Sequence, residues 1–109
     1  MMSTMTKRVE TILDQFSKQP GVTERQASIL REAIATSPLL AKQMDNAVER
    51  GLLQHVDLLP EGATSGGSYN KASKTISLNP STFSNKEVSA AIDTTTFFGY
   101  PDFIVGSQL

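Results

Sequence analysis

The spacing of the apolar residues changes at Gly51, and this change divides the chain into two parts. Before Gly51, apolar residues recur every three or four positions, which is typical of amphipathic helices. After Gly51, short apolar runs alternate with polar residues and with turn-forming Gly, Pro and Asn, which is typical of strands. Helices followed by strands predict an α+β domain.

Three helices are predicted before Gly51. The first lies between residues 6 and 18 and has its apolar face on Val9, Ile12, Leu13 and Phe16. Thr23 and Gln26 have the spacing of a capping box, so the second helix begins after Thr23. Ser37 ends the second helix and caps the third, whose first position suits Pro38. Gly51 then ends the third helix, because glycine readily adopts the left-handed conformation of a helix terminus.

The second part predicts a small antiparallel sheet of about three strands. Residues 52–59 mix apolar and polar residues over a length of eight and are bounded by Gly51 and Pro60, which favours a first strand. A Gly-rich loop follows over residues 61–67. Tyr69 then precedes a turn-rich stretch, and Ile76 and Leu78 follow it, which predicts a β-hairpin.

A C-terminal helix is predicted to begin at Asn85. Ser84 and Glu87 again have capping-box spacing, ahead of the apolar residues Val88 and Ile92. Residues 1–5 show no periodicity, and we expect them to be disordered. Residues 6–109 then form a single α+β domain.

Composition excludes several function classes. The 109 residues include 10 Lys and Arg and 11 Asp and Glu, so the formal net charge is -1. This balance argues against binding to nucleic acid or to a membrane surface. No apolar stretch is long enough to cross a membrane, and residues 1–10 lack the apolar core of a secretory signal. We therefore expect a protein that stays in the cytoplasm or is exported without a classical signal peptide.

The residue types that build catalytic and metal sites are scarce. The chain has no Cys and one His, His55, whereas zinc sites take several ligands that are mostly His and Cys. Asp57 lies two residues after His55 on the same face of the predicted strand, and the pair is a weak candidate for metal binding or catalysis. A structural role is favoured for both. The sequence predicts no catalytic residue, no metal ligand, no cofactor and no enzyme activity.

Two other segments have simpler interpretations. The loop EGATSGG over residues 61–67 has the glycines of a phosphate-binding loop but lacks the following Lys, so it is interpreted as a connector. Lys7, Arg8 and Lys18 are interpreted as a solvated helix face, balanced by their neighbours Glu10 and Asp14.

Large apolar residues gather near the C-terminus. Five of them are candidate partner-binding residues: Phe97, Phe98, Tyr100, Phe103 and Ile104. One interpretation is that this segment completes the core as a last helix or strand. The other is that it forms a docking surface for a protein partner or for a second copy of the chain.

The hairpin GGSYNKASKTISLNPSTF (Gly66–Phe83) follows a strand and a Gly/Ser loop. This order resembles the region before the zinc-binding helix in bacterial zincin-like metallopeptidases, some of which occur in secreted toxins and effectors. In that group a Gly-Gly-x-Tyr/Phe…x-Ile-x-Leu hairpin often leads to a helix that begins F-x-x-G-H-E-x-x-H. The resemblance covers residues 52–109.

The sequence departs from this family at the catalytic motif. Aligning Gly106 with the glycine before the motif puts Ser107 at the first His ligand and Gln108 at the catalytic Glu. Gln cannot act as the general base, and Ser is a poor zinc ligand. The resemblance therefore implies a non-catalytic zincin-like remnant, or an N-terminal region of a secreted bacterial effector. The alternative is a small interaction module that docks through the aromatic residues 97–104.

Overall fold

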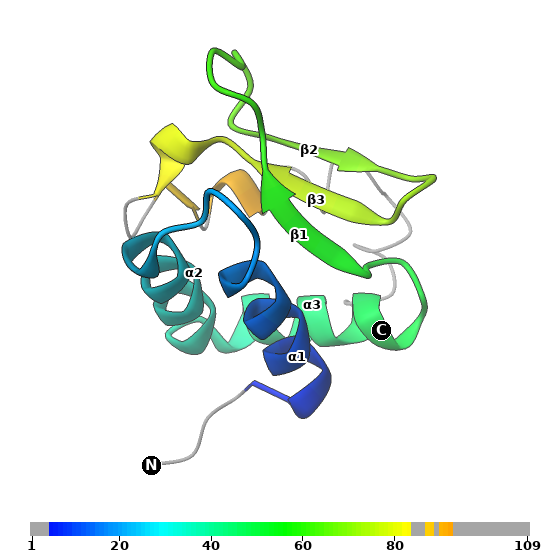
Figure 1. The fold of residues 1–109 in the computed structure, drawn as a ribbon. Helices are drawn as coiled ribbons and strands as arrows, with labels where there is room; N and C mark the ends of the chain where they lie inside the picture. The colour runs from blue at the N-terminus through cyan, green and yellow to red at the C-terminus, as the bar shows by residue number, and fades with distance from the viewer. Residues whose placement is uncertain (1–4, 84–86, 89, 93–109) are drawn as a thin grey trace.

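The computed structural model describes residues 5–83, 87, 88 and 90–92. In chain order its elements are α1 (Lys7–Ser17), α2 (Glu24–Ala35), α3 (Pro38–Glu49), β1 (His55–Leu58), β2 (Gly67–Asn70), β3 (Thr75–Leu78) and the 3₁₀ turn η1 (Pro80–Thr82). Residues 87, 88 and 90–92 are also helical. Figure 1 shows the sheet lying across the helices. The predicted α+β class, with three N-terminal helices and a short C-terminal one, is confirmed.

The helix starts follow the predicted caps. In the capping box of α2, the Thr23 N–H donates to Gln26 Oε1 at 3.0 Å, and the Gln26 N–H donates to Thr23 Oγ1 at 3.1 Å. Ser37 accepts from the Leu40 N–H at 3.3 Å, and Pro38 is the first residue of α3. Each cap gives a partner to an N–H group that the helix itself leaves unpaired.

Gly51 ends α3 as predicted, with a φ of +74°. The Leu52 N–H donates to the Ala47 carbonyl at 2.8 Å, and the Gly51 N–H donates to the Val48 carbonyl at 3.1 Å. These two bonds form a Schellman motif, which pairs the last carbonyls of the helix. The chain leaves this motif towards β1, so one glycine sets the junction between the helices and the sheet.

The predicted hairpin is present, but the sheet is mixed and not wholly antiparallel. The strand order is β1-β3-β2, with β2 antiparallel to β3 and β1 parallel to it. Tyr69 lies opposite Ile76 on one side of β3, and Val56 lies beside Ile76 on the other. Burial explains why β3 is the central strand. Three of its four residues are buried, whereas β1 and β2 each present exposed residues at the edges.

The core forms between the helices and the sheet. The predicted face of α1 is buried as a set, comprising Val9, Ile12, Leu13 and Phe16. The Phe16 ring stacks on the Phe83 ring, with centroids 6.1 Å apart and planes 4° from parallel. Val88 and Ile92 bring the last described helix into the same core.

The ends of the chain are described only in part. Met5 is described and packs against the core, whereas residues 1–4 lie outside the described residues. Ser84 and Asn85, the predicted cap and first residue of the last helix, also lie outside them.

Candidate functional site

The structure places His55 and Asp57 on β1 with different surroundings. His55 is exposed at the start of the strand. Asp57 is half-buried and accepts a hydrogen bond from the Ser77 hydroxyl at 2.5 Å. Ser77 is the neighbour of Asp57 in the parallel register of β1 and β3. The Asp57 carboxylate thus links the two strands. Within the described part of the chain, no three His, Cys, Asp or Glu residues gather where they could hold a metal ion.

The Gly-rich loop before β2 is organised by Asn79, whose bonds to this loop the sequence interpretation did not predict. The Asn79 amide Nδ2 donates to the carbonyls of Ala63 at 2.9 Å and Ser65 at 3.0 Å. Its Oδ1 accepts from the Ser81 N–H at 3.0 Å, which begins η1. These bonds support the interpretation of the loop as a connector. The Asn-Pro pair at residues 79 and 80 was the available signal, since Asn side chains often bond to nearby backbone.

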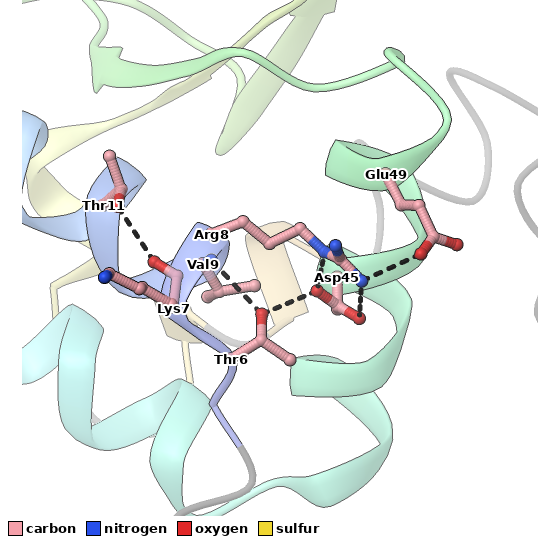
Figure 2. Close-up of polar contacts among 7 residues, drawn as sticks. All are labelled: Thr6, Lys7, Arg8, Val9, Thr11, Asp45 and Glu49. Carbon is pink, nitrogen blue, oxygen red and sulfur yellow. Dashed lines mark hydrogen bonds and ion pairs between the residues drawn. The ribbon is translucent and has the colours of Figure 1, made fainter.

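Arg8 lies in a cluster of charges that joins α1 to α3 (Figure 2). Its Nε donates to Asp45 Oδ1 at 2.5 Å, and its Nη2 donates to Asp45 Oδ2 at 3.2 Å and to Glu49 Oε2 at 2.9 Å. The Thr6 hydroxyl donates to Asp45 Oδ1 at 2.6 Å and accepts from the Val9 N–H. The sequence interpretation balanced the charge of Arg8 with Glu10 and Asp14. In the structure, Arg8 pairs with Asp45 and Glu49 instead.

Glu10 and Asp14 instead face Arg31 on α2. The Arg31 Nη2 lies 2.9 Å from Asp14 Oδ1, and its Nη1 lies 3.9 Å from Glu10 Oε1. The polar face of α1 is thus divided between its two neighbouring helices. Such exposed pairs contribute little to stability, about 0–1 kcal/mol each.

The Arg8 cluster shifts the ionisation of its members. The hydrogen bond from Arg8 is the main cause that lowers the pKa of Asp45, and the Thr6 hydroxyl adds to it, while partial burial opposes both. The hydrogen bond to Asp45 likewise raises the pKa of Arg8. Both shifts favour the charged forms, as expected for an ion pair.

We expect Asp45→Asn to destabilise the fold at neutral pH and to have less effect in acid. The folded-state pKa of Asp45 is depressed, so its stabilisation is present above the ordinary value of 3.8 and is lost as the pH falls through the lower folded value. Thermal unfolding of both proteins across this range measures the difference in Tm. Glu61→Gln is the control, because Glu61 is exposed in the loop before β2 and takes no part in the Arg8 cluster. A Tm difference that does not change with pH would contradict the ion pair.

The described residues form at least two grooves. The first, which we call the Gly66 groove, has a volume of about 660 Å³ and lies between the start of β2 and the helical residues 87, 90 and 91. The second, the α1 groove, has a volume of about 440 Å³ and lies between α1 and the connection from α3 to β1. Arg8, Gln15 and His55 line the α1 groove. The sequence predicted neither groove, because each is assembled from distant segments.

The predicted partner-binding residues Phe97, Phe98, Tyr100, Phe103 and Ile104 lie outside the described residues. So do Ser107 and Gln108, on which the comparison with the zincin catalytic motif depends. None of the described helices is both long enough and apolar enough to span a membrane. No family model, curated protein or solved structure matches the chain.

Proposed function

We propose that this protein is a non-catalytic interaction domain that docks on a protein partner through Phe97, Phe98, Tyr100, Phe103 and Ile104. The observation that supports this most directly is how few large hydrophobic side chains the described surface exposes. Among the described residues, Leu39 is the one large hydrophobic side chain that is exposed, at 62%. Apolar docking needs a contiguous patch, and a single leucine does not make one. The aromatic segment holds the large apolar residues that such an interface uses.

The interaction proposal also agrees with the chemistry of the described residues. The Asp57 carboxylate bonds to Ser77, and His55 is exposed on an edge strand. A general base or nucleophile needs a partner that orients or activates it. The arrangement of these two residues supports a structural role for Asp57 and gives no reason to assign catalysis to His55.

Substitution of Phe98 tests the proposal. We expect Phe98→Asp to abolish concentration-dependent self-association in sedimentation experiments, or the recovery of a partner in a pull-down. Leu39→Asp is the matched control, since it places the same charge at the exposed leucine of the described surface. It should bind as the wild type does. Unchanged association in a folded Phe98→Asp protein would remove the basis of the proposal.

The zincin resemblance gives a second candidate, which is a catalytically inactive remnant or an N-terminal region of a secreted bacterial effector. The observation that favours it is the hairpin, in which Tyr69 of the Gly-Gly-x-Tyr stretch pairs with Ile76. Ser107 and Gln108 in place of a zinc ligand and a general base support the absence of hydrolysis. Metal analysis and a peptide-cleavage assay test this candidate. Stoichiometric zinc or measurable turnover would contradict it.

A further inference from the structure

Strand β1 has a backbone edge to which none of the described strands is paired. It is an outer strand of the sheet and packs against α1 (Figure 1). The Leu59 N–H donates to the Leu78 carbonyl of β3 at 2.8 Å. Backbone groups of successive residues in a parallel strand point to opposite sides of it. Those of Val56 and Leu58 therefore face away from β3, along the outer edge.

Gln19 covers part of this edge. Its side-chain amide Nε2 donates to the Val56 carbonyl at 2.6 Å, where a neighbouring strand would otherwise donate. In the described part of the chain, no bond is made to the outward N–H and carbonyl of Leu58. Unpaired groups on an edge strand are a template for pairing with another extended chain. Gln19 is thus a partial cap, and the edge beyond it is open.

The α1 groove gives an extended chain room beside β1. Its volume is about 440 Å³, and its lining includes Gln15 of α1, Gln54, and His55 at the start of β1. Those three side chains are exposed, whereas Ile12 and Leu53 in the same lining are buried. A strand edge with space beside it suits an extended peptide, which adds to the sheet through backbone hydrogen bonds.

The charge of Asp57 restricts which chain can pair with this edge. Asp57 lies between Val56 and Leu58, and its Oδ1 accepts from the Ser77 hydroxyl, while its Oδ2 makes no hydrogen bond within the described residues. A second copy that paired antiparallel with Val56 and Leu58 would place its own Asp57 directly opposite this one. Like charges in that position destabilise a strand pair, whereas an opposite charge stabilises it. The edge therefore disfavours self-pairing and favours a strand with a basic residue at its centre.

We propose that the open edge of β1 binds an extended basic segment of a protein partner, which displaces Gln19 and places a Lys or Arg opposite Asp57. The segment pairs antiparallel with the backbones of Val56 and Leu58. This docking goes beyond the proposed function and does not require the aromatic residues 97–104.

Two blocked pentapeptides test the docking on the full chain. They are acetyl-Thr-Val-Lys-Val-Thr-amide and the same peptide with Glu in place of Lys, titrated while nuclear magnetic resonance follows the amides of Val56 and Leu58. We expect saturable shifts at both amides and several-fold tighter binding of the Lys peptide. Asp57→Asn, which keeps an oxygen to accept from Ser77, should abolish this preference. Equal affinity for the two peptides, or no shift at β1 with millimolar peptide, would overturn the inference.

Removing the cap gives an independent measurement. Gln19→Ala should bind the Lys peptide several-fold more tightly, because the peptide no longer competes with the Gln19 amide for the Val56 carbonyl. Ser17→Ala is the matched control, since Ser17 is uncharged, exposed and two residues away, and its affinity should equal that of the wild type. Unchanged affinity in Gln19→Ala would contradict the displacement of the cap.

Sedimentation of Gln19→Ala without peptide examines the other occupant. We expect a monomer, because pairing of two copies would oppose the two Asp57 carboxylates. A dimer that the Lys peptide does not dissociate would assign the edge to a second copy and contradict the inference. Phe98→Asp should bind the Lys peptide as the wild type does. Loss of partner binding in that variant with retained peptide binding therefore distinguishes this edge from the proposed function.

Discussion

Replacing Phe16 by alanine should reduce the free energy of unfolding by about 3–5 kcal/mol, the usual range for a large buried aromatic residue. Phe16 is 1% exposed and stacks on Phe83, which is 5% exposed. Deleting the ring removes its apolar burial and leaves a cavity where α1 meets the end of η1. Urea titration followed by circular dichroism measures the change. The expected loss is a large fraction of the total stability of such a domain, which is about 5–15 kcal/mol.

Two substitutions separate the cavity from the aromatic stacking. Phe83→Leu keeps most of the volume but loses the ring pair, which is worth about 0.5–1.5 kcal/mol beyond its buried area. Leu39→Ala removes an exposed side chain and should change stability by less than about 0.5 kcal/mol. If Phe16→Ala were as mild as Leu39→Ala, the packing of α1 against Phe83 would be wrong.

The helices could be predicted because their signals are local. Thr23 and Gln26 are three residues apart and satisfy each other's backbone N–H groups. Gly51 ends α3 through bonds to carbonyls a few residues earlier. Such interactions depend on the nearest neighbours in sequence, so the pattern of residue types already contains them. The hairpin, with Tyr69 paired to Ile76, was found for the same reason.

The sheet order depended on contacts between distant residues. A period of two identifies strands but does not say which of them is central. Leu78 is fully buried and Thr75 is 7% exposed, yet Thr and Ser in β3 made the strand appear half-exposed from sequence. The chain reverses direction between β1 and β2 and again at the hairpin turn, so β3 lies beside β1 and runs parallel to it. The central position of β3 follows from the burial of Thr75, Ile76 and Leu78, and this burial depends on tertiary contacts that the sequence does not show.

The Arg8 cluster and the grooves could not be predicted from the sequence for the same reason, because they also depend on contacts between distant residues. Arg8 and Asp45 are 37 residues apart, and their contact requires α1 and α3 to pack first. Gly66 and Ala91 meet across a groove although the sequence places them in a loop and a helix. Only the aromatic segment at residues 97–104 was evident from composition, because it concentrates large apolar residues in one place.

Gln43 on α3 is the residue whose replacement should stabilise the fold. It is 6% exposed, and its side-chain oxygen Oε1 is buried without a hydrogen-bond partner in the described structure. A buried acceptor that loses its bonds to water without replacing them costs about 1–3 kcal/mol. Methionine has a similar length and no oxygen, and its flexible chain adapts to irregular space. Gln43→Met should therefore raise the free energy of unfolding by about 1–3 kcal/mol.

The same substitution at an exposed glutamine supplies the comparison. Gln15 on α1 is exposed, so Gln15→Met should alter stability by less than about 0.5 kcal/mol. Gln43→Glu should destabilise the protein, because it would bury a charge at the same place. Urea titrations of the three variants decide the matter. A loss of stability in Gln43→Met would show that the Gln43 amide makes a stabilising bond, and the hydrogen-bond arrangement around α3 would then need revision.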